Sequence, residues 1–165
     1  MSKARAFLAA VINALLIFII FILRYSCGVT LGIGQAVPII LIPLVISCAI
    51  FYGENAAMLA GFFAGVLMDS SSASGSWFNA LFLTLGALVC GFLSSRVLNR
   101  NFKAAVCLSV GFSFGYFFVK YLIFFVFEGI PVSYDYFLLD LIPSAVYTAA
   151  WLIPFYFLQK KLSNS

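Results

Sequence analysis

The chain has 165 residues, of which 65% are hydrophobic and only 8% are charged, and its mean hydropathy is +1.17. Soluble domains are about half apolar and a quarter charged, so this composition excludes an ordinary soluble domain and indicates an integral membrane protein. The sequence contains no histidine, which removes the usual general base and most metal sites. We therefore expect no catalytic residue, cofactor or metal, and a function that is not enzymatic.

Six apolar segments are long enough, or nearly so, to cross a bilayer, which takes about 20 residues with roughly 17 to 25 allowed. They predict an all-α integral membrane protein with six transmembrane helices in one bundle, and a single membrane domain over residues 1–165. The predicted helices cover residues 6–24, 34–52, 55–71, 77–95, 103–127 and 135–158.

The first predicted helix follows Lys3 and Arg5, so a cleaved signal sequence is the alternative interpretation. The apolar run is longer than a usual signal sequence, and no small-residue cleavage pattern follows it. We therefore predict that this helix is retained. Ala10 and Ala14 are spaced four residues apart on it, which lets another helix approach closely.

In the third predicted helix, Gly61, Gly65 and Asp69 fall four residues apart and so share one stripe. Glycines let a neighbouring backbone approach, whereas a carboxylate in a membrane needs a partner, a cavity or an aqueous edge. Gly111 and Gly115 repeat the spacing in the fifth helix. Such stripes are either contacts inside the bundle, which we favour, or surfaces for a partner.

Lys120 lies about seven residues from the outer end of the fifth predicted helix, hence roughly 10 Å below it. An unpaired lysine at mid-membrane costs roughly 2.5 to 3.5 kcal/mol on insertion scales, so we expect it to pair with an acid or to snorkel. Asp140 and Asp69 are expected at compatible depths. We interpret the pair as one that locks helices together, with an outward-opening polar pocket as the alternative.

With six spans, both termini and most of the basic residues fall on one side of the membrane. The residues concerned are Lys3, Arg5, Arg96, Arg100, Lys103, Lys160 and Lys161. The positive-inside rule then places both termini in the cytoplasm, where these side chains also hold anionic lipid headgroups. This asymmetry accounts for the net charge of +4, so nucleic acid is not an expected partner.

From residue 36 onward the order of features resembles the MreD family of bacterial rod-shape-determining membrane proteins. In the first half of the chain the likeness is carried by Pro38 before a long aliphatic helix, by Gly53-Glu54, and by the Gly61-Phe62-x-x-Gly65-x-x-x-Asp69 run. A Ser/Gly loop ending near Gly75 and then Asn79-Ala80-Leu81 follow. In the second half it is carried by the basic patch Arg96 to Lys103 and by Ile142-Pro143-x-x-x-Tyr147-Thr148 before Lys160 and Lys161.

The resemblance implies a scaffold subunit of the cell-elongation complex in the bacterial cytoplasmic membrane. Its partner would be MreC, whose single helix would pack against this bundle. The MreB filament and the RodA glycosyltransferase with its transpeptidase would complete an assembly that inserts sidewall peptidoglycan.

The architecture is also similar to the substrate-binding subunits of energy-coupling-factor vitamin transporters. These have six helices, cytoplasmic ends and Ala-xxx-Ala pairs in helices 1 and 3. On that alternative, Trp77, Lys120, Tyr134 and Asp140 would line an outward pocket for a small vitamin. The chain offers few such convergent polar and aromatic groups, so the scaffold is preferred.

Overall fold

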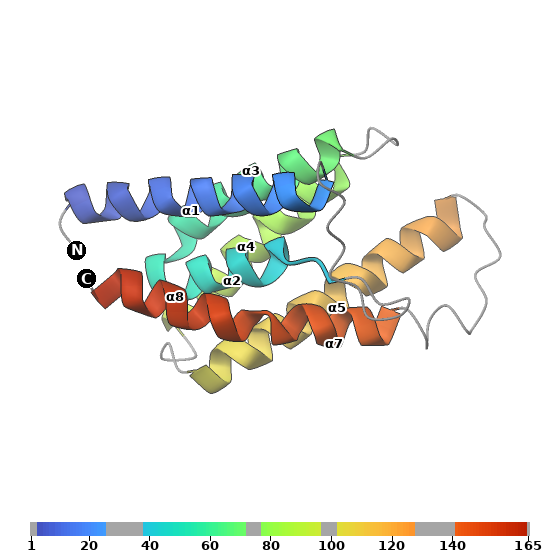
Figure 1. Cartoon of the computed structure of the whole chain (residues 1–165). Helices are drawn as coiled ribbons and strands as arrows, with labels where there is room; N and C mark the ends of the chain where they lie inside the picture. The colour runs from blue at the N-terminus through green and yellow to red at the C-terminus, as the bar shows by residue number, and fades with distance from the viewer. Residues whose placement is uncertain (1–2, 26–37, 72–76, 97–101, 128–140, 165) are drawn as a thin grey trace.

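The computed structural model describes residues 3–25, 38–71, 77–96, 102–127 and 141–164 (Figure 1). Within these ranges all regular structure is helical, which confirms the predicted all-α class. The helices are α1 (Lys3–Tyr25), α2 (Leu41–Tyr52), α3 (Glu54–Ser70), α4 (Phe78–Arg96), α5 (Phe102–Phe127), α7 (Ile142–Ala150) and α8 (Leu152–Asn164).

Helices α1 to α7 run in alternating directions, α8 continues in the direction of α7, and α1 begins at the same end of the bundle at which α8 ends (Figure 1). The connection between α2 and α3 is the shortest of these reversals, since only Gly53 separates the two helices. Gly53 adopts φ 85°, a left-handed conformation that glycine reaches without steric cost. The chain can therefore reverse direction within a single residue.

Helix α2 is the centre of the bundle, because it contacts each of the other described helices. Every residue from Leu41 to Ile50 is buried. The segment carries no charged residue and is apolar around its whole circumference, as expected of a helix enclosed on all sides.

Helix α2 begins later than predicted, at Leu41 rather than at residue 34. Residues 34–37 lie outside the described residues, and residues 38–40 form a turn instead of helix. The Ile39 N–H donates to the Thr148 hydroxyl at 3.0 Å, and the Arg24 guanidinium donates to the Pro38 carbonyl. Side chains from α1 and α7 thus satisfy backbone groups that a longer helix would have bonded internally.

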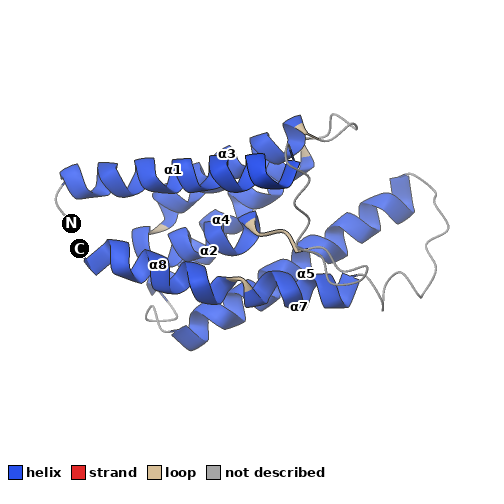
Figure 2. Ribbon diagram, in the orientation of Figure 1, coloured by secondary structure: helices blue, strands red, loops and turns tan. Residues whose placement is uncertain are grey.

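The predicted sixth helix, 135–158, is wrong as one continuous helix. Its residues 135–140 lie outside the described part, and the remainder consists of α7 and α8 with a break at Trp151, drawn as a loop in Figure 2. Pro154 explains the break, because proline has no N–H and its ring clashes with the carbonyl four residues earlier, at Ala150. Helix α8 also continues to Asn164, beyond the predicted end.

Helices α3, α4 and α5 begin and end within one residue of their predicted bounds. Two of the described helices are long and apolar enough to cross a membrane, by length and composition: Phe78–Arg96 and Phe102–Ile123. The apolar helices Leu8–Arg24 and Leu41–Tyr52 are shorter.

Candidate functional site: the α3–α4 clamp and the α1–α3 groove

The glycine stripe of α3 is a contact inside the bundle. A Cβ added to Gly61 would lie 2.5 Å from the Leu83 carbonyl oxygen, and one added to Gly65 would lie 2.4 Å from the Ala80 Cα. Both glycines are buried. The backbone of α4 therefore occupies the space that side chains at these positions would need, and the pair is not open to a partner.

Asp69, the third residue of the stripe, holds the beginning of α4. Its Oδ1 accepts hydrogen bonds from the Asn79 N–H at 3.2 Å and from Asn79 Nδ2 at 2.8 Å, and its Oδ2 accepts one from the Ala80 N–H at 2.8 Å. The first N–H groups of a helix have no partner within it, and their partial positive charge favours an anion. A carboxylate from α3 thus caps α4.

A hydrogen-bonded chain extends this cap to α5. The Tyr116 hydroxyl donates to Asn79 Oδ1 at 2.5 Å, while Asn79 Nδ2 donates to Asp69. Tyr116 is buried, and its ring packs against Phe78 and Phe82 of α4. We define the α3–α4 clamp as Gly61, Gly65, Asp69, Asn79 and Ala80; sequence spacing had not identified Tyr116 as the residue that ties α5 to it.

The second predicted glycine pair is in a different environment. A Cβ on Gly111 would meet no described atom within 4 Å, and one on Gly115 would meet only the Phe82 ring, at 4.0 Å. The stripe on α5 therefore packs against no described backbone, although its spacing equals that on α3.

Ala10 and Ala14 of α1 line a groove of about 610 Å³, whose other wall is α3 and whose floor is α2. We call this the α1–α3 groove. Its lining residues are Ala10, Asn13, Ala14, Ile17, Cys48, Phe51, Tyr52, Ala56, Leu59, Ala60 and Phe63.

A buried amide pair lies behind the groove. Gln159 Nε2 of α8 donates to Asn13 Oδ1 of α1 and lies 3.5 Å from Cys48 Sγ of α2. Asn13 Nδ2 in turn donates to the Ala9 carbonyl at 2.9 Å. Three helices are joined by these contacts, although residues 13 and 159 are far apart in the sequence.

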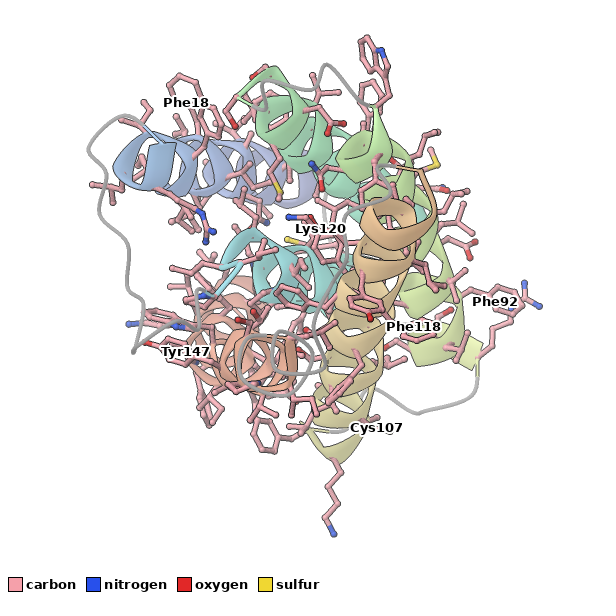
Figure 3. All side chains as sticks on the ribbon, turned by 90° about the vertical axis from the view of Figure 1, so that its right-hand side faces the viewer. Phe18, Phe92, Cys107, Phe118, Lys120 and Tyr147 are labelled. Atoms are coloured by element: carbon pink, nitrogen blue, oxygen red, sulfur yellow. The ribbon has the colours of Figure 1, made fainter. Side chains whose placement is uncertain are left out.

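Lys120 is half-buried on the inner side of α5, toward the middle of the bundle, whereas Phe18 lies on the outside of α1 (Figure 3). Its predicted partner Asp140 lies outside the described residues. Its other predicted partner, Asp69, caps α4 as described above. The pairing of Lys120 with either acid remains a prediction.

Among the described residues, no cluster of three or more His, Cys, Asp or Glu side chains is placed to hold a metal ion. The chain matches no protein-family model, no curated protein and no solved structure at a significant level.

Proposed function

We propose that the chain is a multi-pass protein of the bacterial cytoplasmic membrane, with six crossings and both termini in the cytoplasm. The proposal draws support from the composition, from the alternating helix directions, and from the common end of the bundle at which α1 begins and α8 ends (Figure 1).

The charges of the described helices are consistent with this orientation. Arg96 is in the last turn of α4, Lys103 is in the first turn of α5, and Lys161 is in the last turn of α8. All three positions fall at the end of the bundle that holds the termini. Arginine and lysine gather on the cytoplasmic side of membrane proteins, where they also meet anionic lipid headgroups.

Within that membrane, we propose a scaffold role like that of the MreD family. The protein would bind MreC and help to organise sidewall peptidoglycan synthesis with MreB, RodA and its transpeptidase. One observation carries the proposal: the Gly61, Gly65, Asp69 and Asn79-Ala80 residues, which give the sequence its likeness to that family, act together in the α3–α4 clamp. Together these residues pack α3 against α4 and cap the beginning of α4.

The vitamin-transporter alternative receives less support from the described residues. It requires Trp77 to line a pocket, but Trp77 is 67% exposed. Two further pocket residues of that model, Tyr134 and Asp140, lie outside the described ranges. The alanine pairs on α1 and α3, which both models share, do not discriminate between them.

The test is copurification. The tagged chain, expressed with MreC from its own bacterium, is expected to retain MreC through detergent extraction, while an unrelated single-span protein of similar expression is lost. Depletion of the chain is expected to turn rods into spheres. Loss of MreC during purification, together with normal rods that need an added vitamin, would overturn the scaffold in favour of the transporter.

A further inference from the structure

A cluster of aromatic rings joins the beginning of α5 to α8, at the end of the bundle that holds the termini (Figure 1). The Phe102 ring meets the Tyr156 ring edge-on with centroids 5.0 Å apart, and it stacks on the Phe157 ring at 6.1 Å. The Tyr156 ring also lies 5.1 Å from the ring of Phe51 on α2. We call Phe102, Tyr156 and Phe157 the α5–α8 aromatic cluster; it holds the first residue of α5 against α8.

The aromatic cluster has a buried side and an exposed side. Tyr156 is buried, whereas Phe102 is 40% exposed and Phe157 is 57% exposed. Removal of such apolar surface from water is favourable. In the proposed membrane arrangement the two exposed rings therefore face acyl chains, and they do so near the cytoplasmic surface.

Exposed lysines flank these two rings. Lys103 directly follows Phe102 on α5. On α8, Lys160 is four residues after Tyr156 and three after Phe157, and residues at these spacings share one face of a helix. Both lysine side chains are exposed. Two cations, one from each helix, thus lie beside one pair of exposed rings.

Acidic side chains are scarce around these lysines. Among the described residues the acids are Glu54 and Asp69, and Asp69 caps α4. The end of the bundle that holds the termini carries Arg96, Lys103, Lys160 and Lys161 and is therefore positively charged. The charge complementary to this surface is negative.

The combination of rings and cations indicates the kind of anion. Lys160 lies about one helical turn beyond the rings toward the chain end, so its ammonium reaches the headgroup level while the rings stay at the acyl level. Free phosphate would meet the ammonium groups but would leave the exposed rings without a partner. A phospholipid with a net negative charge meets both.

We propose that the α5–α8 aromatic cluster, with Lys103 and Lys160, binds one anionic phospholipid of the cytoplasmic leaflet. The two ammonium groups hold its phosphate, and an acyl chain lies on the exposed rings of Phe102 and Phe157. The inference rests on the proposed function for its membrane orientation, but it does not depend on MreC.

The test is native mass spectrometry of the purified full chain, with phosphatidylglycerol or phosphatidylethanolamine of identical acyl chains added to the detergent. We expect a preference for phosphatidylglycerol, and Lys103→Gln or Lys160→Gln should each weaken its binding about fivefold, the usual effect of one lysine at an anionic surface. Arg96→Gln is the matched control, because it removes one positive charge at the same end of the bundle. Its guanidinium lies 5.1 Å from the Phe92 ring centroid on α4 and is not part of the cluster.

A second variant tests the rings. Phe157→Ala, at an exposed position, should weaken both lipids about threefold and leave their ratio unchanged, because the acyl chains are identical. Soluble glycerol phosphate should displace neither lipid.

The lipid site is overturned if both lipids bind equally, if Arg96→Gln is as harmful as Lys160→Gln, if Phe157→Ala changes nothing, or if glycerol phosphate displaces the lipid. None of these results bears on the scaffold role, which copurification with MreC tests separately. Release of the chain from bacterial membranes by alkaline carbonate would instead refute the proposed membrane arrangement, and the lipid site with it.

Discussion

The two glycine pairs permit a matched test of the packing. Gly65→Ala and Gly111→Ala are the same change at two positions inside helices, each in a glycine pair of the same spacing. Replacing glycine by alanine in a helix interior favours the helix by up to about 1 kcal/mol. At Gly111 nothing described lies within 4 Å of the new Cβ, so we expect a gain of about 0.5 to 1 kcal/mol.

At Gly65 the new Cβ would lie 2.4 Å from the Ala80 Cα and 2.6 Å from the Asn79 carbonyl oxygen. These are backbone atoms, so α3 and α4 must separate, and overpacking of this kind costs typically 1 to 3 kcal/mol. Taking the upper value and subtracting the helix preference leaves about 2 kcal/mol of destabilisation. The two variants should therefore differ by about 3 kcal/mol.

The assay is reversible unfolding of the purified chain in mixed detergent micelles, followed by helical circular dichroism and compared at a fixed denaturant concentration. Gly61→Ala should behave like Gly65→Ala, because its Cβ would lie 2.5 Å from the Leu83 carbonyl oxygen. The distinction between the two stripes would be refuted if the Gly65→Ala variant were as stable as the unaltered chain. It would also be refuted if Gly111→Ala lowered the free energy of unfolding as much as Gly65→Ala does.

Three further predictions concern the polar contacts, and each is measured by the same unfolding assay. Asp69→Asn is expected to destabilise by about 1 to 2 kcal/mol, because it removes the charge that caps α4. Ser70→Ala is the control: its hydroxyl donates to the Leu67 carbonyl of the same helix, and its loss should change stability by less than about 0.5 kcal/mol. Tyr116→Phe should cost about 0.6 kcal/mol, and a double-mutant cycle with Asn79→Ala should recover a coupling of that size; zero coupling would contradict the hydrogen bond between them. Gln159→Leu should cost about 1 to 3 kcal/mol, because Asn13 Oδ1 on α1 loses the amide that donates to it, and leucine at both positions should restore most of the loss.

The positions of the helices could be predicted from the lengths of the apolar runs, because a bilayer sets the length of a span. The runs between residue 54 and residue 127 are bounded by polar or glycine-containing turns, and there the predicted and observed bounds agree within one residue. The start of α2 could not be predicted in the same way. It depends on the Thr148 hydroxyl and Arg24, which come from distant parts of the chain.

The candidate site was predicted only in part, because residue spacing places residues on one face of a helix without saying what that face meets. Gly61 and Gly111 begin pairs of equal spacing, yet the first touches the backbone of α4 and the second touches nothing described within 4 Å. Asp69 was expected to need a partner, and the partner proved to be the backbone of a helix end. Gln159 gave no signal at all, since its importance comes from contact with a residue at the other end of the chain.

These contacts also indicate where a neighbouring helix has no room to pack. The α3 glycines, which would be the first choice from sequence for a partner surface, are already used by α4, and the cap at Asp69 fixes that pair further. Helix α1 is held differently: it faces α3 through alanines across an open groove, and its amide contact reaches past that groove to α8. Because a helix can add packing only where packing is incomplete, a partner helix is not expected at the glycines of α3, whereas the α5 stripe of Gly111 and Gly115 has open space beside it among the described residues.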